Sequence, residues 1–308
     1  KGLRTTRKAI IGPWAHKYPH FAVPEPRIGF LQEALRWWDQ WLQNVPTGVA
    51  RDPDYRYYVM EAYKPGTFPE RIDGRWLGDS FWGFGHVDTK KWSLNANGIG
   101  PTPGEEKALT VSSKQTTGVE SGGEYCVIWL GPEFPGDQAK DDAQSITFDT
   151  PALVTDIDIV GQPAVELDFS VDKPVASVAV RLNDVWPGGE VSRITYHLQN
   201  LCMRDSRETP TRLEPGKRYR MKIKLDDIAW HELCDRNFLR STIADDRGGD
   251  RDHRLEFGCG GIGPILLDQL QANAHDNHQR HHGSRARIAG RERDDCQQGQ
   301  EHDQRVEQ

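Results

Sequence analysis

The sequence lacks closely spaced cysteines, long apolar runs and any block of positive charge. Its five cysteines are Cys126, Cys202, Cys234, Cys259 and Cys296. They are far apart and include no CxxC pair, so the pattern favours neither a zinc site nor a disulfide scaffold and indicates a reducing cytoplasm. The longest apolar runs, 127–130 and 262–267, fall far short of the roughly 18 residues that cross a bilayer. No membrane span is therefore expected.

The charge balance argues against nucleic acid as the main partner. The 308 residues carry a formal net charge of −7 with a pI of about 5.9, and Lys and Arg are dispersed along the chain. The length suffices for two domains. Residues 1–10 are basic, but no apolar segment of signal-peptide length follows them, and the first residue is not Met. The chain is therefore interpreted as a fragment or a processed piece.

Residues 1–50 combine a short strand with an amphipathic helix. The run 7–11 predicts a strand that Gly12 and Pro13 close, because proline cannot continue a strand ladder. Over residues 30–42, apolar side chains recur at spacings of three and four, which predicts a helix with one apolar face. These apolar residues are Phe30, Leu31, Ala34, Leu35, Trp38, Trp41 and Leu42.

Residues 51–230 change from a helical period to a period of two. The segment 218–226 shows this best, because its apolar and charged side chains alternate, as in a half-buried strand. Similar alternation occurs in 165–171, 178–182 and 194–198, and turns rich in Gly and Pro separate these segments. Many short strands with such turns predict an antiparallel β-sandwich or jelly roll.

A histidine, His16, follows the first predicted strand in the stretch GPWAH, residues 12–16. The last segment of an α/β-hydrolase has the same order of elements: a strand, a turn that ends it, an exposed histidine and a helix. The stretch resembles the GPWxH motif of the CocE/NonD group of serine hydrolases, to which cocaine esterase and X-Pro dipeptidyl-peptidase belong. Further similar stretches, in the same order, are 35–39 with 41–42, 57–60, 145–151, 181–185 and 225–230. The resemblance covers about residues 1–230.

The resemblance implies a mostly β fold. Residues 1–50 would be the last strand, histidine loop and helix of an α/β-hydrolase domain. Residues 51–230 would be a truncated, galactose-binding-like jelly roll of the kind found at the C-terminus of X-Pro dipeptidyl-peptidase. It also implies that His16 is the general base and acid of a Ser-His-Asp triad. Trp14, Tyr18 and Phe21 are candidates for an acyl pocket, although packing of the loop against the helix explains them equally well.

The sequence departs from this family at the nucleophile. It contains no GxSxG elbow, and the resemblance places the serine and the aspartate before residue 1. We therefore expect no ester hydrolysis by this chain alone. The implied partners are a small-molecule ester or amide and the missing upstream catalytic domain, with no nucleic acid and no membrane. No cofactor and no bound metal are expected, and the oligomeric state stays open.

Residues 231–308 differ in composition from the rest. All ten Trp and all eight Tyr precede this region, whereas seven of the eleven His lie in it and Lys is absent from it. Such a composition supplies too little apolar area to offset the entropy of ordering, which predicts a poorly ordered tail, mostly disordered beyond residue 271. The loss of resemblance at His231 also suggests a shifted reading frame from about that codon. A natural acidic or His-rich tail is the alternative.

Two motifs in this tail are interpreted as chance patterns. Residues 258–263 fit GxGxxG, but Pro264 and the polar tract after residue 271 leave no βαβ unit for a dinucleotide. Four histidines have the spacing of metal ligands: His275, His278, His281 and His282. Without a supporting core they predict at most weak zinc or nickel binding.

Two alternatives to a hydrolase fragment stay open. In the first, residues 51–230 are a non-catalytic module that binds carbohydrate-like ligands, with Trp76, Trp82 and Trp92 as an aromatic platform. In the second, the jelly roll is purely structural and shields or positions an active site that upstream sequence supplies. The second alternative is compatible with the hydrolase interpretation.

Overall fold

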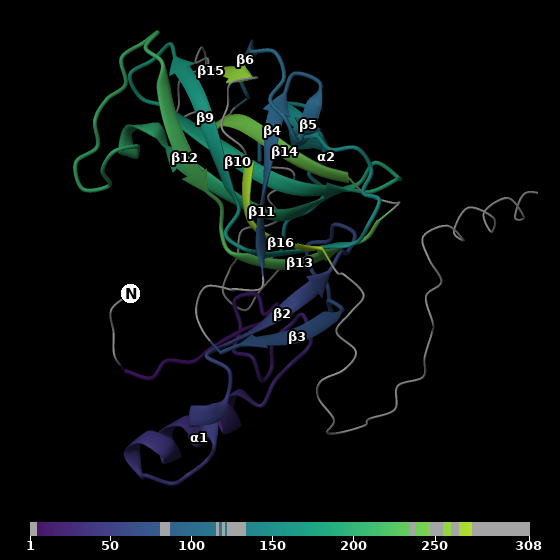
Figure 1. Cartoon of the computed structure of the whole chain (residues 1–308), viewed down its shortest axis with the longest axis vertical. Helices are drawn as coiled ribbons and strands as arrows, with labels where there is room; N and C mark the ends of the chain where they lie inside the picture. The colour runs from purple at the N-terminus through teal and green to yellow at the C-terminus, as the bar shows by residue number, and fades with distance from the viewer. Residues whose placement is uncertain are drawn as a thin grey trace, which may run out of the picture.

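The computed structural model describes residues 5–80, 87–114, 117–118, 121, 134–234, 238–246, 255–259 and 265–272. These residues form a β-sandwich and a smaller N-terminal part, which contains the long helix α1 (Phe30–Leu42) (Figure 1). The sandwich follows the N-terminal part in the chain and lies above it in the view. The candidate histidine therefore belongs to the smaller part.

The N-terminal part consists of three strands beside one helix. Besides α1 it contains β1 (Ala9–Ile11), the 3-10 turn η1 (Val49–Arg51), β2 (Tyr55–Glu61) and β3 (Gly74–Asp79). β1 runs parallel to β2, with Ala9 opposite Tyr55, and β3 pairs antiparallel along β2. The predicted strand before Gly12 and the predicted helix over residues 30–42 are confirmed.

The sandwich is made of two sheets. Its elements are β4 (Asp88–Asn95), β5 (Gly98–Gly100), β6 (Lys107–Val111), α2 (Ala139–Asp142), β7 (Ile146–Asp149), β8 (Ile157–Gly161), β9 (Ala164–Val171), β10 (Ser177–Val185), β11 (Val191–Asn200), η2 (Leu201–Met203), β12 (Tyr219–Lys224), β13 (Ile228–Glu232), β14 (Phe238–Asp246), β15 (Leu255–Cys259) and β16 (Ile265–Ala272). The large sheet runs β1-β2-β13-β8-β16-β9-β15-β6, with β3, β4, β5 and β12 attached, and the small sheet runs β11-β10-β14-β7. The large sheet thus continues from the sandwich into the N-terminal part.

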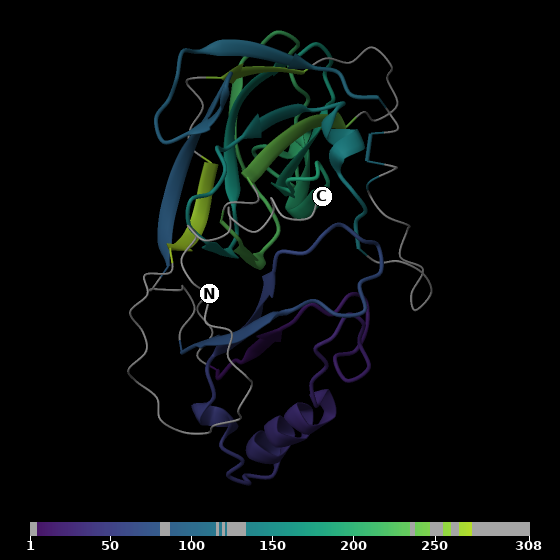
Figure 2. The ribbon, with the colours of Figure 1, turned by 90° about the vertical axis from the view of Figure 1, so that its right-hand side faces the viewer.

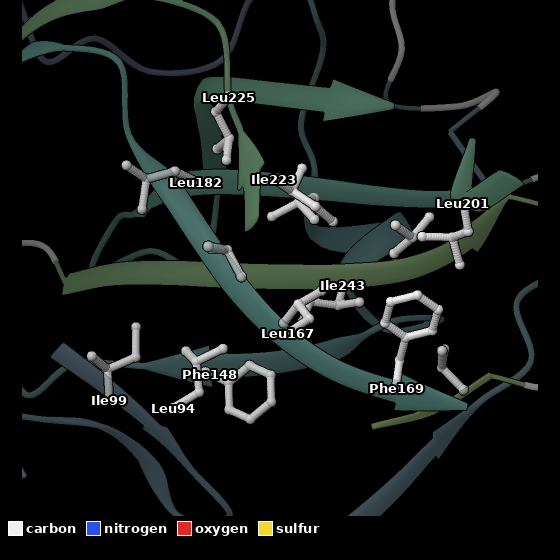
Figure 3. Close-up of a cluster of buried hydrophobic side chains, with 14 of the residues drawn as sticks. Leu94, Ile99, Phe148, Leu167, Phe169, Leu182, Leu201, Ile223, Leu225 and Ile243 are labelled. Carbon is white, nitrogen blue, oxygen red and sulfur yellow. The ribbon is translucent and has the colours of Figure 1, made fainter. Parts of the chain in front are cut away.

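One hydrophobic core fills the space between the two sheets (Figure 3). Leu167 and Phe169 of β9 enter it from the large sheet, and Leu182 of β10 and Ile243 of β14 enter it from the small sheet. Full burial of one such side chain contributes about 1.5–3 kcal/mol. The shared core therefore holds the two sheets together.

The predicted alternation of apolar and charged residues is confirmed in β12. Ile223 is buried, and Tyr219 and Met221 pack against the core, whereas Arg220 is exposed between them. β12 pairs antiparallel with β9, so that Tyr219 lies opposite Phe169. The two strands therefore turn their apolar faces to the same core. The strands predicted around 165–171, 178–182 and 194–198 are present as β9, β10 and β11.

The structure differs from the expected poorly ordered tail in three segments after residue 231. β14 lies between β10 and β7 and pairs with β10 from Ser177 to Val185. β15 pairs with β9 and β6, and β16 pairs with β4, β8 and β9. Backbone hydrogen bonds do not depend on side-chain type, so partners on both sides order segments that are poor in aromatic residues. The histidine cluster and residues 260–263 of the GxGxxG stretch lie outside the described residues.

Two observations bear on the surroundings of the protein. Neither α-helix among the described residues is long and apolar enough to cross a membrane. Cys202 is a buried free thiol, whereas Cys234 is disulfide-bonded. The expectation of reduced cysteines therefore does not hold for Cys234.

Candidate functional site

The loop that leaves β1 carries His16, and β1 and α1 lie together in the lower, purple part of the ribbon (Figure 2). Pro13 is buried and His16 is exposed. The amide of Lys17 donates to the carbonyl oxygen of Ala15 at 2.9 Å, so the chain turns tightly at the histidine. Ala15, His16, Lys17 and Tyr18 line an open hollow of ≈ 610 Å³. The imidazole is thus presented at a hollow large enough for a small organic substrate.

Trp14 anchors this loop to the β2–β3 hairpin. Its indole Nε1 donates to the carbonyl oxygen of Pro26 at 2.7 Å. Its ring centroid lies 5.9 Å from that of Trp76 on β3, which lies 5.2 Å from Tyr58 on β2. Trp14 was a candidate for the acyl pocket, but it is not among the described residues that line the hollow. Its contacts fix the position of the loop.

An aromatic cluster joins the other end of the loop to α1. The ring centroid of Tyr18 lies 6.0 Å from that of Phe30, the first residue of α1, and 5.9 Å from that of Phe21. The ring of His20 lies 4.5 Å from Phe21 and stacks nearly parallel on Phe30 at 6.0 Å. Of the remaining pocket candidates, Tyr18 therefore reaches both the hollow and the cluster, whereas Phe21 packs within the cluster.

The segment between β2 and β3 also contacts the loop that carries His16, which the sequence did not predict. The Nζ atom of Lys17 lies 5.6 Å from the ring centroid of Phe68. The amide of Glu25 donates to the carbonyl oxygen of Glu70 at 2.8 Å, and the amide of Ile72 donates to that of Glu25 at 3.1 Å. These contacts join segments that are distant in the sequence. An exposed aromatic residue in a loop, here Phe68, is the sequence signal that points to such a contact.

Ion pairs hold α1 on one side, while its apolar face is exposed. Glu33 accepts hydrogen bonds from Arg56 at 3.0 and 3.1 Å, and Arg36 donates to Asp52 at 3.0 Å. The Arg56 guanidinium holds the pKa of Glu33 below its ordinary value. The exposed apolar residues are Leu31, Leu35, Trp38, Trp41 and Leu42, with 42% to 70% of their surface accessible. Exposed apolar faces of this kind are typical of surfaces that another chain or segment covers.

The other predicted ligand sites do not assemble among the described residues. Trp76 packs on Trp14 and Tyr58, whereas Trp92 of β4 packs against the core of the sandwich. The third residue of the proposed platform, Trp82, lies outside the described residues. In the part of the chain that the structure describes, no group of three or more His, Cys, Asp and Glu residues could hold a metal ion.

We expect Gly12→Ala to loosen the histidine loop. A Cβ atom on Gly12 would lie 2.6 Å from Cε2 and 2.7 Å from Cζ2 of Trp14, so the indole would have to leave its place between Pro26 and Trp76. Overpacking of this kind costs about 1–3 kcal/mol of unfolding free energy. Urea unfolding monitored by tryptophan fluorescence measures the change. Gly66→Ala is the control, because a Cβ atom there meets nothing within 4 Å. Equal stability of both variants would contradict the packing described for Trp14.

The fold and the loop together define a class of protein: a β-sandwich whose large sheet continues into a smaller part with a strand, a histidine loop and a helix. Residues 47–231 match the model of the X-Pro dipeptidyl-peptidase C-terminal non-catalytic domain. The chain belongs to this family. The predicted resemblance to the C-terminal part of CocE/NonD-type proteins is thereby confirmed.

Solved structures agree with this assignment. A CocE/NonD family hydrolase from Staphylococcus aureus shares 13% sequence identity with a TM-score of 0.55, over 77% of this chain and 46% of its own. An aminopeptidase from a marine sediment Thaumarchaeota archaeon shares 14% identity with a TM-score of 0.61, over 86% and 49%. An α-amino acid ester hydrolase shares 15% identity with a TM-score of 0.60, over 84% and 50%. This chain therefore spans about half the length of these proteins. No curated protein matches the sequence.

Proposed function

We propose that this chain is the C-terminal part of a serine hydrolase of the CocE/NonD type, which acts on acyl esters or peptide-like amides with His16 as general base and acid. The observation that carries the proposal is the exposed imidazole on an anchored loop beside a hollow of ≈ 610 Å³. Trp14 and the Tyr18 cluster support it, because they hold the loop at both ends. A catalytic group must be held in place in this way to transfer a proton efficiently.

In this reaction His16 moves protons at two points. It takes the proton of a serine hydroxyl, which upstream sequence supplies, while the serine oxygen bonds to the carbonyl carbon of the substrate. It then gives that proton to the leaving alcohol or amine as the acyl bond breaks. The same two transfers, with water in place of serine, release the acid from the acyl-enzyme. Lys17 and Tyr18 contact the substrate, since they line the hollow beside His16.

The upstream half of the protein docks on the N-terminal part of this chain. The apolar face of α1 is exposed, and β1 is the terminal strand of the large sheet within the described residues. A further parallel strand beside β1 and apolar side chains over α1 would cover both. The solved proteins of similar fold are about twice as long as this chain, which leaves room for such a half. In this arrangement the sandwich supports the catalytic half.

A serine-directed fluorophosphonate probe and p-nitrophenyl acyl esters test the proposed function. We expect no labelling and no hydrolysis by this chain alone. We expect both from the product of a reading frame extended upstream, because the activated serine lies there. A serine-to-alanine variant of the extended protein is the control for the labelling. An extended protein that hydrolyses neither acyl esters nor amides would refute the proposal.

A further inference from the structure

A buried histidine, His231, lies where the sandwich meets the N-terminal part. It is on β13, and 6% of its surface is exposed. Its Nδ1 atom lies 2.7 Å from Oδ1 of Asp158 on β8, whose exposed fraction is 1%. Asp158 also accepts a hydrogen bond from Arg75 on β3. This cluster is separate from the proposed active site, because none of its residues is among the described residues that line the hollow at His16.

The other side of the imidazole faces two further carboxylates. Its Nε2 atom lies 3.7 Å from Oε2 of Glu61, at the end of β2, and 3.8 Å from Oδ2 of Asp156, just before β8. Among the residues that the structure describes, three carboxylates therefore lie around the ring, and Arg75 is the cation that pairs with one of them. On β13 itself, Glu232 accepts a hydrogen bond from the indole of Trp230 at 2.9 Å. The surroundings favour the doubly protonated, positively charged ring.

The pKa directions agree with this geometry. Burial disfavours the charged imidazolium, but the hydrogen bond to Asp158 and the charges of Glu61 and Asp158 outweigh burial, so the pKa of His231 rises above its ordinary value of 6.5. Burial likewise acts to raise the pKa of Asp158, yet the hydrogen bonds from His231 and Arg75 hold that pKa below its ordinary value of 3.8. Both pKa shifts therefore favour the ionised form of their group.

The cluster sits on a short junction between the two parts of the molecule. β13 pairs with β2 in only two positions, Trp230 with Met60 and His231 with Glu61. One more backbone hydrogen bond, from the amide of Ala62 to the carbonyl oxygen of His231 at 2.9 Å, completes the direct link. Apolar packing also crosses the junction, since Tyr57 and Val59 of β2 cluster with Val160 of β8. The ionic cluster is the part of this junction whose strength depends on the protonation of a histidine.

We propose that the charged ring of His231 holds the β2–β3 hairpin on the sandwich, and that this attachment weakens when the ring loses its proton. We call the cluster of His231, Asp158, Glu61 and Asp156 the clasp. The contribution of His231 to stability is complete below pH 6.5, the value for the unfolded chain, and is lost as pH rises through its higher folded value. The contribution of Asp158 is lost as pH falls through its folded value, below 3.8. The clasp is therefore strongest between these two limits. Because Trp76 and the segment 68–72 hold the His16 loop, the clasp also sets how firmly that loop is placed.

Hydrogen exchange of the intact chain tests the clasp. Exchange is measured from pH 6 to pH 9 and corrected for the intrinsic dependence of amide exchange on pH, and the histidine ring protons are titrated by NMR. We expect His231 to titrate above 6.5. When the ring loses its proton, opening of β2 and β3 should become more frequent. The increase should be roughly tenfold for each pH unit by which the titration midpoint of His231 exceeds its value in the unfolded chain. Exchange in the paired strands β10 and β11 should not change with pH.

Two variants and one control complete the experiment. His231→Gln should remove the pH dependence of exchange in β2 and β3. Glu61→Gln should lower the titration midpoint of His231 while it keeps the hydrogen bond to Asp158. His197→Gln is the control, because His197 lies on β11 with its Nδ1 atom 3.9 Å from Asp226, away from the junction. A titration midpoint of His231 at or below 6.5 in the unaltered chain would overturn the proposal, as would a wild-type pH dependence in His231→Gln.

Discussion

Replacing His16 by alanine in the extended, active protein is expected to lower kcat for acyl ester hydrolysis by about 10⁶-fold, as removal of a triad histidine does. Without the imidazole, no group takes the serine proton during attack or returns it to the leaving group. Steady-state kinetics with p-nitrophenyl esters measures the loss. KM should change little, because the imidazole transfers protons and supplies little of the binding of the acyl group.

His20→Ala is the matched control for this experiment. His20 lies in the same loop, but its ring stacks on Phe30 and packs edge-on against Phe21. We expect its loss to change kcat by less than about tenfold, since it acts through packing. Full turnover by His16→Ala, or equal losses in the two variants, would remove the basis for the proposed function. Circular dichroism of both variants establishes that the sandwich is intact.

Replacing Arg181 by methionine is expected to lower the free energy of unfolding by about 3–5 kcal/mol, the usual cost of breaking a buried ion pair. Arg181 lies on β10, forms an ion pair with Asp142 of α2 at 2.9 Å and donates a hydrogen bond to Gln138 at 2.9 Å. The exposed fractions of the Arg181 and Asp142 side chains are 9% and 2%. Methionine fills similar space but leaves the carboxylate of Asp142 with less compensating charge. Urea unfolding measures the change.

An exposed ion pair provides the control. Arg218 pairs with Glu106, and both side chains are more than half exposed. Arg218→Met should change the free energy of unfolding far less than Arg181→Met does, because solvent screens the pair. The double variant Arg181→Met with Asp142→Leu should regain part of the lost stability, since the Asp142 carboxylate is then no longer left buried without Arg181. A loss below about 1 kcal/mol for Arg181→Met alone would show that the pair does not hold α2 to β10.

The sequence predicted those elements whose periodicity is local. The alternation in 218–226 identified β12 and its buried face, because each side chain of a strand points opposite to its neighbours. The spacing of apolar residues identified α1 with its bounds. The prediction of a poorly ordered tail, which was based on composition, was wrong for three segments after residue 231, where the structure has β14, β15 and β16. Composition measures what a segment can bury by itself, but these strands gain their order from partners such as β10 and β9.

The candidate site was predictable only as a single residue. The GPWAH stretch pointed to His16, and Tyr18 lines the same hollow. The contacts that hold the loop come from Trp76, Phe68 and the segment 68–72, which no local pattern connects with His16. For Trp14 the sequence left two roles open, the acyl pocket and packing of the loop, and in the structure its indole donates to the carbonyl oxygen of Pro26.

The sequence by itself determined the class of fold, the helix, many of the strands and the one histidine on which the proposed chemistry depends. These follow from side-chain periodicity and from a short motif, which act over a few residues. Only the tertiary structure decided that His231 lies among Asp158, Glu61 and Asp156, that Arg181 is buried against Asp142, and that α1 exposes its apolar face. Burial and charge pairing depend on which distant segments meet, and that is set by the packing of the whole chain.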